Sequence, residues 1–168
     1  MDYEDYLDRM GTDTVGRYDA TPLFADPETF AELRADLLAR VPNTPTAVVG
    51  IDALGFVLGG ALATELGVGF VAVRKGGKLP YPPEELLRRA FTDYSGEAKA
   101  LELHPDALSP GDRVLLVDEW VETGAQMRAA ATLVEAAGAT VAGVLAIRVP
   151  ENEGTESLFE RYDVRSIG

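Results

Sequence analysis

Two adjacent carboxylates, Asp118 and Glu119, stand where the apolar run Arg113–Val117 ends. The run is short and apolar, which predicts a buried strand, so both side chains are expected to project from the strand end into a crevice. A few residues later, Thr123 and Gly124 begin a predicted helix, whose free backbone amides can bind a phosphate together with the Thr123 hydroxyl. Carboxylates for a sugar diol or a metal-bound sugar, beside amides for a phosphate, indicate a ribose 5-phosphate site. The alternative that these residues leave open is a solvated strand-to-helix turn.

The composition narrows the other chemistries. The 168 residues include no cysteine, which excludes disulfides, thiolate metal sites and cysteine nucleophiles. The single histidine, His104, argues against a multi-histidine metal site and a Ser-His-Asp triad, and we expect it at the surface before a turn. The formal net charge of −13 makes nucleic acid and anionic membranes unexpected partners.

The excess of acidic residues, with very few lysines, is typical of a halophile or a GC-rich genome, and we interpret the charge as solvation. The first ten residues are acidic and lack a long apolar run, so they do not resemble a signal peptide. No stretch approaches the ~20 apolar residues of a membrane span. We therefore expect a cytoplasmic protein.

Alternating strand and helix patterns surround the carboxylates. The expected order is strand, helix, strand, strand, helix and strand, at residues 46–51, 55–66, 68–73, 113–117, about 124–138 and 140–149. The first three form a βαβ unit, which implies parallel strands. These patterns predict one α/β domain over residues 1–168, an open sheet whose ligand lies at the carboxyl ends of the strands.

The flanking segments are less regular. Asp26-Pro27 is a helix start signal, and the apolar spacing that follows predicts a helix ended by Pro42. Residues 2–10 are expected as a short helix or an extended arm, and the tail as a short helix and an edge strand. Residues 74–98 are polar and contain several Gly and Pro, so we expect a long functional or mobile loop before a short strand at 100–103.

The segment Arg113–Met127 resembles the 5-phosphoribosyl diphosphate motif of type I phosphoribosyltransferases, which is four apolar residues, two acids, two variable residues and a small-residue Thr-Gly loop. Further segments resemble adenine phosphoribosyltransferases in the same order along the chain: Asp19–Phe30, Gly50–Phe56, Val73–Pro80, Leu101–Leu108 and Tyr162–Ile167. The chain is therefore identified as a member of the type I family, close to the adenine branch. The resemblance implies a central, mostly parallel sheet flanked by helices, with a small hood built from the two termini.

This resemblance implies a role for each residue of the site. The paired acids Asp118 and Glu119 hold the sugar hydroxyls and act as catalytic groups that stabilise an oxocarbenium-like transition state. The 5-phosphate is bound by the loop that runs from Glu122 through Thr123, Gly124, Ala125 and Gln126. The implied reaction is the displacement of diphosphate from the anomeric carbon by a purine nitrogen.

The diphosphate is implied to lie against a tight turn, where relatives often have a cis peptide, and against a basic loop; the turn is Asp52-Ala53-Leu54, and the loop carries Arg74, Lys75 and Lys78. Basic residues are scarce in this chain, yet these three lie within five positions, which favours binding over a solvated turn. Mg is implied to bridge the diphosphate and the ribose hydroxyls near Asp118 and Glu119, without a direct protein ligand. Residues 76–98 are implied to close as a lid, and a homodimer is implied because Arg74 in relatives reaches toward the neighbouring active site.

The sequence departs from the adenine branch within this site. Leu54 stands where that branch usually has Arg, although archaeal hypoxanthine-type relatives also have an apolar residue there. The phosphate loop ends Gly124-Ala125-Gln126 instead of Gly-Gly-Thr, which predicts weakened or rearranged phosphate binding. Glu122 replaces a common Ala and matches an Asp that serves 6-oxopurine enzymes as acid or base, so it is a candidate catalytic residue. The alternative for Glu122 is a solvent-facing loop acid.

The residues expected around the base also differ. Relatives stack the purine on the Phe of a Phe-Arg pair, and this chain has Arg17-Tyr18. The stacking candidates are therefore Tyr18, after a register shift, and Trp120, for which core packing is the alternative. Asp93 matches a Glu near the adenine site. We expect a purine phosphoribosyltransferase that uses adenine, with hypoxanthine or guanine as the alternative. Two further hypotheses are a non-catalytic sensor of phosphoribosyl diphosphate or nucleotides and a transferase for another nitrogen base.

Overall fold

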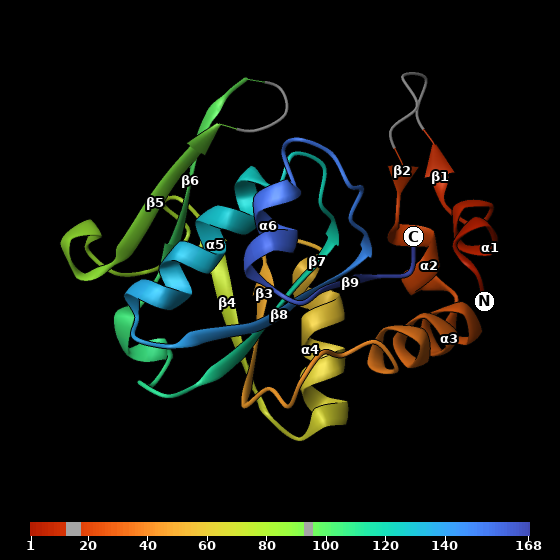
Figure 1. The fold of residues 1–168 in the computed structure, drawn as a ribbon, viewed down its shortest axis with the longest axis horizontal. Helices are drawn as coiled ribbons and strands as arrows, with labels where there is room; N and C mark the ends of the chain where they lie inside the picture. Colours follow the sequence, from red (N-terminus) through yellow and green to blue (C-terminus); the bar gives the residue numbers. More distant parts are fainter. Residues whose placement is uncertain (13–17, 93–95) are drawn as a thin grey trace.

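The computed structural model describes residues 1–12, 18–92 and 96–168. A seven-stranded sheet in the order β5-β6-β4-β3-β7-β8-β9 forms its centre (Figure 1). The parallel strands are β4 (Gly69–Lys75), β3 (Ala47–Ile51), β7 (Arg113–Trp120), β8 (Thr140–Arg148) and β9 (Val164–Ser166). The hairpin of β5 (Leu87–Thr92) and β6 (Ala98–Leu103) adds to β4 in the antiparallel sense. The sheet is therefore mixed and mostly parallel, as the sequence predicted.

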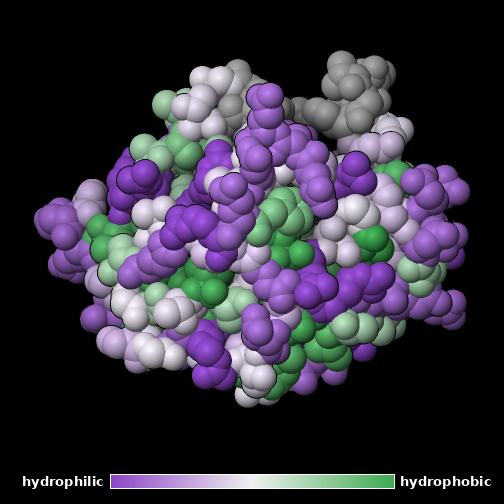
Figure 2. All heavy atoms as spheres, in the orientation of Figure 1, coloured by the Kyte–Doolittle hydropathy of each residue, from purple (hydrophilic) through white to green (hydrophobic). Residues whose placement is uncertain are grey.

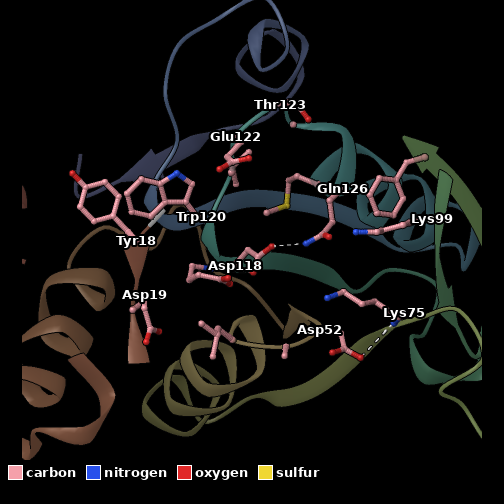
Figure 3. Close-up of a pocket in the computed structure, with 18 residues that line it drawn as sticks. Tyr18, Asp19, Asp52, Lys75, Lys99, Asp118, Trp120, Glu122, Thr123 and Gln126 are labelled. Atoms are coloured by element: carbon pink, nitrogen blue, oxygen red, sulfur yellow. Dashed lines mark hydrogen bonds between the residues drawn. The ribbon is translucent and has the colours of Figure 1, made fainter. Parts of the chain in front are cut away.

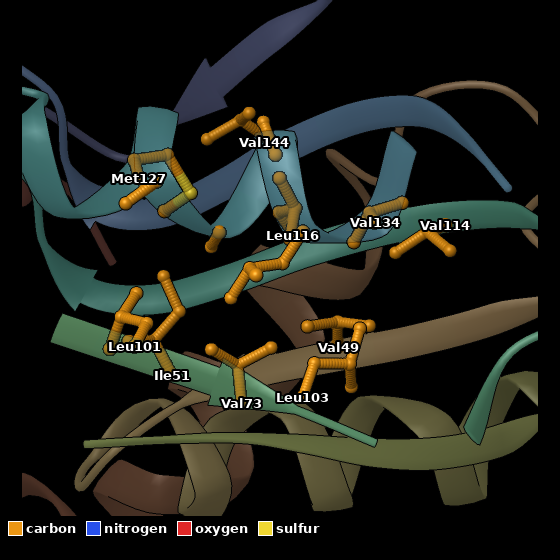
Figure 4. Close-up of a cluster of buried hydrophobic side chains, with 14 of the residues drawn as sticks. Val49, Ile51, Val73, Leu101, Leu103, Val114, Leu116, Met127, Val134 and Val144 are labelled. Atoms are coloured by element: carbon orange, nitrogen blue, oxygen red, sulfur yellow. The ribbon is translucent and has the colours of Figure 1, made fainter. Parts of the chain in front are cut away.

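Helices cover both faces of the sheet. Residues that alternate along the central strands point to opposite faces, so Val49 and Leu116 pack in the cluster beneath α5 (Ala125–Ala136), as Figure 4 shows. Val48 and Leu115 belong to the second cluster, which contains the buried residues of α4 (Gly55–Leu66) and α3 (Pro27–Leu38). Strands buried on both faces read as continuous apolar runs, which is why the sequence revealed them.

The two termini build a separate layer at one end of the sheet. The N-terminal elements are α1 (Tyr3–Leu7), β1 (Gly11–Thr12), β2 (Tyr18–Asp19) and α2 (Thr21–Ala25). Tyr6 is fully buried and donates its hydroxyl to Asp36 Oδ2 on α3 at 2.7 Å. Ile167 of the C-terminal tail packs against the same cluster, and a Cβ on Gly168 would overlap the ring of Tyr3 on α1. This layer corresponds to the expected hood.

Most of the predicted elements are confirmed. The strand at 46–51, the helix at 55–66 and the strand at 140–149 agree with β3, α4 and β8 within a residue. Asp26 caps α3 by accepting the amide of Thr29 at 2.8 Å. The tail forms a short helix, α6 (Glu156–Arg161), and an edge strand, as expected. His104 begins a turn, η2 (Pro105–Ala107), and its Nδ1 accepts the amide of Asp106 at 3.2 Å.

Two expectations were wrong. The long loop at 74–98 contains a short 3-10 helix, η1 (Pro83–Glu85), and the whole of β5, while β6 begins at Ala98 instead of residue 100. Strand β5 has two adjacent arginines and lies at the sheet edge, so it lacks the apolar run that revealed the central strands. Strand β7 extends to Trp120, so Asp118 and Glu119 are among its last three residues and do not follow its end.

The surface agrees with the acidic composition. Hydrophilic side chains cover most of the face seen in Figure 2, with smaller hydrophobic areas between them. Among the residues that the structure describes, no helix is long and apolar enough to cross a membrane.

Candidate active site

A cavity of about 620 Å³ opens at the carboxyl ends of β3 and β7. This is the edge of a parallel sheet where α/β proteins bind their ligands. Its lining is drawn from six segments of the chain (Figure 3): Tyr18, Asp19, Ala20, Asp52, Ala53, Leu54, Lys75, Phe91, Lys99, Asp118, Glu119, Trp120, Val121, Glu122, Thr123, Gly124, Gln126 and Met127. The cavity thus collects most of the residues that the sequence singled out.

Asp118 lies at the centre of the cavity and is only 4% exposed. Its Oδ1 accepts the backbone amide of Glu119 at 3.0 Å, and its Oδ2 accepts Nε2 of Gln126 at 2.9 Å. Burial raises the pKa of Asp118 well above its usual range, and the neighbouring Glu119 carboxyl raises it further, while Gln126 acts in the opposite direction. Two carboxyl groups held this close in a buried site favour a positive charge between or beside them.

Glu119 supplies a second indication of a binding site. Its Oε2 is buried and has no hydrogen-bond partner among the residues that the structure describes. Buried polar atoms are normally paired, so an unpaired carboxylate oxygen in a cavity indicates a group that binds there. A sugar hydroxyl or a cation is the kind of group that a carboxylate accepts.

A close backbone contact positions Asp118. A Cβ placed on Gly55 would lie 2.7 Å from the carbonyl oxygen of Val117 and 3.1 Å from Asp118 Oδ1. Helix α4 therefore begins in direct contact with β7, and only glycine allows that distance. The start of α4 thus supports the carboxylate from the opposite face to Gln126.

The predicted phosphate loop connects β7 to α5. Gly124 has φ +69° and precedes the first helical residue, Ala125, and as the N-cap it has no side chain to cap the helix. The amide of Ala125 donates to the Thr123 hydroxyl at 3.4 Å, and amides at a helix start are the groups that bind an anion. Thr123 and Gly124 line the cavity, whereas Ala125 does not. Gln126 also lines it, but its amide is bound to Asp118 and does not stand free in the loop.

The opposite side of the cavity is the expected diphosphate turn. The Asp52–Ala53 peptide is cis, as the resemblance implied. Asp52 Oδ2 accepts Nε of Arg74 at 3.0 Å and the backbone amide of Lys75 at 3.4 Å. Lys75 lines the cavity, while Arg74 and Lys78 do not. The turn and the basic loop are therefore joined through Asp52, and Lys75 is the member of the basic group that reaches the cavity.

An aromatic pair forms the far end of the cavity. The rings of Tyr18 and Trp120 are stacked, with centroids 5.4 Å apart and planes inclined by 16°. Tyr18 is 47% exposed, and Trp120 also contacts Tyr3 at a centroid distance of 6.3 Å. Figure 3 shows the order of side chains across the site: the aromatic rings lie at one end, Asp118 lies in the middle, and Lys75 and Lys99 lie at the other end. A planar ring, a polyhydroxy unit and a polyphosphate match this order.

Comparison with known proteins shows the family to which the chain belongs. Residues 20–165 match the phosphoribosyl transferase domain family. The chain belongs to the phosphoribosyltransferase family. The adenine phosphoribosyltransferase of Paracidovorax citrulli (strain AAC00-1) is 43% identical over 146 residues, which are 84% of this chain and 77% of that relative.

Solved structures agree with this assignment. The adenine phosphoribosyltransferase of Rhodothermus marinus has a TM-score of 0.85 and 34% identity, and the match covers 98% of this chain and 96% of that one. An APRTase from Giardia lamblia, solved with 9-deazaadenine, has a TM-score of 0.86 and 29% identity over 99% of this chain and 97% of that one. The resemblance and the fold class inferred from the sequence are therefore confirmed.

The phosphoribosyltransferase motif is one continuous unit in the structure, the end of β7 and the start of α5. Glu122 lies within it, exposed at the edge of the cavity. Asp93 and Arg17 lie outside the described residues. The sequence reasoning missed Asp19, Phe91 and Lys99, which also line the cavity. Lys99 is one of three lysines in the chain, and that scarcity is the signal that could have drawn attention to it.

Proposed function

We propose that this phosphoribosyltransferase transfers ribose 5-phosphate from 5-phosphoribosyl diphosphate to adenine, giving AMP and diphosphate. One observation carries the proposal: a stacked aromatic pair, the buried Asp118 with the half-buried Glu119 beside it, and a phosphate loop line one cavity. The adenine phosphoribosyltransferases to which the chain is similar supply the choice of base.

In the proposed reaction the bond from the anomeric carbon to the diphosphate breaks, and a bond from that carbon to the purine nitrogen forms. Asp118 and Glu119 bind the ribose hydroxyls and stabilise the positive charge that develops on the sugar. The raised pKa of Asp118 is consistent with this role, because a positive charge beside the Asp118 carboxyl favours its ionised form. The purine nitrogen loses a proton as this bond forms; in the 6-oxopurine alternative Glu122, exposed at the cavity edge, accepts it, and with adenine it passes to solvent.

The phosphate groups are assigned to two sides of the cavity. The 5-phosphate binds Thr123, Gly124 and the start of α5, where the N-cap residue has no side chain. The diphosphate binds the Asp52-Ala53-Leu54 turn, and Lys75 neutralises part of the charge of the leaving group. Arg74 and Lys78 contribute only if the basic loop moves toward the cavity, because neither lines it here.

Mg fits this site only together with the substrate. No three Asp, Glu, His or Cys residues gather into a metal site in the described part of the chain. Asp118 and the unpaired Oε2 of Glu119 offer oxygen ligands, and Mg is commonly bound by one or two carboxylates plus substrate phosphates. When bound, Mg neutralises the charge of the diphosphate.

A homodimer is part of the proposal. Phe70 on β4 is 37% exposed and meets the ring of Phe56 edge-on at 5.9 Å. The guanidinium of Arg74 lies over Phe56 at 5.7 Å. This apolar group lies beside the residue that reaches toward the neighbouring site in relatives. Phe70→Asp should yield a monomer by light scattering, whereas Tyr81→Asp, at another exposed aromatic, should leave the dimer intact.

An assay with five different bases tests the proposed activity. The protein is incubated with Mg, phosphoribosyl diphosphate and adenine, hypoxanthine, guanine, xanthine or uracil, at low and at molar salt, and diphosphate release is measured. Release with adenine supports the proposal. Release with hypoxanthine or guanine alone supports the 6-oxopurine alternative, which Glu122 at the cavity edge favours. Thermal stabilisation by phosphoribosyl diphosphate without turnover would indicate a sensor.

Glu122→Ala separates the two purine classes further. If Glu122 serves the purine as acid or base in the 6-oxopurine manner, the substitution lowers turnover far more with hypoxanthine than with adenine. An equal loss with both bases would remove the argument for that role.

A further inference from the structure

A turn outside the phosphoribosyltransferase motif lies in direct contact with the phosphate loop. It comprises residues 150–155, between β8 and α6, and we call it the brace turn. We infer that Asn152 in the brace turn and Arg128 on α5 are positioning residues that orient the phosphate loop toward the 5-phosphate. This inference rests on the proposed function for the identity of the anion.

The brace turn is locked by its own hydrogen bonds. The side-chain Oδ1 of Asn152 accepts the backbone amides of Gly154 at 2.8 Å and Thr155 at 3.1 Å. Thr155 is fully buried, and its hydroxyl donates to the carbonyl of Pro150 at 2.6 Å and accepts the amide of Asn152 at 3.0 Å. Because Oδ1 is committed to two amides, the orientation of the Asn152 amide is determined.

That orientation directs the other end of the amide at the phosphate loop. Nδ2 of Asn152 donates to the carbonyl oxygen of Glu122 at 3.1 Å. Nη1 of Arg128 donates to the next carbonyl, that of Thr123, at 3.3 Å, and also to the carbonyl of Gly154. Two successive carbonyls of the phosphate loop are therefore bound from the side of the brace turn.

The two backbones are also too close to admit side chains. A Cβ on Gly154 would lie 2.7 Å from the carbonyl oxygen of Thr123. A Cβ on Gly124 would lie 2.8 Å from both Arg128 Nη1 and the carbonyl oxygen of Gly154. The contact is therefore a fitted one, and a small displacement of the brace turn moves the phosphate loop with it.

The planar geometry of the peptide gives this contact a consequence for anion binding. In a trans peptide, the carbonyl and the following N–H point in opposite directions. Binding the carbonyls of Glu122 and Thr123 toward the brace turn therefore turns the amides of Thr123 and Gly124 away from it, toward the cavity that both residues line. The same contact keeps those carbonyl oxygens, which would repel a phosphate, out of the binding face.

The decisive variants each change one side chain of the brace. Asn152→Asp keeps the acceptor for the amides of Gly154 and Thr155 and replaces the donor to the Glu122 carbonyl by a carboxylate oxygen. Arg128→Met removes the donor to the carbonyls of Thr123 and Gly154, and Arg128→Lys is the conservative rescue. Glu153→Gln is the matched control, because Glu153 lies exposed in the same turn. Urea unfolding of each variant shows whether the fold is retained, and only variants that keep the midpoint of the original protein are compared.

The readout compares ligands with and without the phosphate. Dissociation constants are measured by calorimetry for AMP, adenosine and ribose 5-phosphate, in molar salt so that the added charge of Asn152→Asp is screened. We expect Asn152→Asp and Arg128→Met each to weaken AMP and ribose 5-phosphate about tenfold and to leave adenosine unchanged. Arg128→Lys should recover part of the loss, and Glu153→Gln should have no effect.

Several outcomes would overturn the inference. An equal loss for AMP and adenosine would mean that the brace supports the whole site and not the phosphate loop. Unchanged binding in both variants would mean that the loop holds its orientation without the brace. If the unaltered protein binds ribose 5-phosphate but forms no AMP, only the proposed base is wrong, and the brace is tested on ribose 5-phosphate alone. If it does not bind ribose 5-phosphate at all, the inference fails.

Discussion

Replacing Gln126 by leucine is expected to lower kcat and to leave the affinity for phosphoribosyl diphosphate nearly unchanged. The sequence suggested that Gln126 takes the place of a phosphate-binding Thr. In the structure its Nε2 instead donates to Asp118 Oδ2 at 2.9 Å, deep in the cavity. Leucine has a similar volume and no donor, so the substitution tests that hydrogen bond with little change in packing.

The size of the effect follows from the burial of Asp118. The carboxylate is 4% exposed, so water cannot readily replace the lost donor. A hydrogen bond to a charged group is worth about 1.5–3 kcal/mol, and each ~1.4 kcal/mol in the barrier is a factor of ten. If the bond holds Asp118 in place as the sugar becomes positive, kcat falls about ten- to a hundredfold.

Steady-state kinetics with phosphoribosyl diphosphate varied at saturating base separates the two roles. Gln126→Thr supplies the hydroxyl that is common in relatives but is too short to replace the donor to Asp118, so it should be as slow as Gln126→Leu. The reasoning is refuted if Gln126→Leu raises the KM for phosphoribosyl diphosphate about tenfold with kcat unchanged and Gln126→Thr restores it. That pattern would make Gln126 a phosphate ligand after all.

Three further predictions concern the support of the site and the hood. Gly55→Ala should destabilise the protein by about 1–3 kcal/mol in urea unfolding and lower kcat, because the new Cβ would lie 2.7 Å from the Val117 carbonyl oxygen. The control Gly60→Ala should be neutral or stabilising, because its Cβ would have no atom within 4 Å. Glu102→Gln should raise the KM for phosphoribosyl diphosphate, because the buried carboxylate anchors the basic loop by accepting both the amide of Gly77 at 2.8 Å and Nη1 of Arg88, whereas glutamine offers one oxygen for the two donors; an unchanged KM would contradict this. Burial raises the pKa of Asp36, but hydrogen bonds from the amino group of Met1 and from Tyr6 outweigh it and lower the pKa below 3.8. The stability that Asp36 contributes is therefore present above the unfolded-state pKa and is lost as the pH falls through the lower folded-state pKa, so the urea midpoints of the original protein and Asp36→Asn should differ at pH 7 and converge in strong acid.

The sequence predicted the parts of the fold that are governed by local pattern. The central parallel strands are apolar on both faces, and their runs are visible without any knowledge of the partners. Strand β5 was missed because an edge strand with the sequence Leu-Arg-Arg-Ala-Phe-Thr gains its stability from pairing with β6, which the local pattern does not contain. The end of β7 was placed too early because Asp118 and Glu119 interrupt the apolar run while the pairing with β8 continues to Trp120.

The same distinction applies to the site. The motif residues could be predicted because they are contiguous, and a strand followed by a helix brings them to one edge. Lys99 and Asp19 come from the hairpin and the hood, and only the tertiary fold carries them into the cavity. The partner of Gln126 could not be predicted either, since the choice between a phosphate and Asp118 depends on the rotamer and on the depth of the carboxylate.

The charge of the whole chain and the charge of the cavity have opposite consequences for an anionic substrate. A net charge of −13 repels phosphoribosyl diphosphate at long range, but the Debye length falls from about 10 Å at 0.1 M salt to about 3 Å at 1 M. Salt therefore weakens the repulsion from surface acids much more than it weakens contacts made at hydrogen-bond distance inside the cavity. The protein needs few basic residues if they are placed at those contacts. Of the three lysines in the chain, Lys75 and Lys99 line the cavity and Lys78 follows in the adjoining loop, so this scarce side chain is concentrated where an anionic substrate would make its contacts.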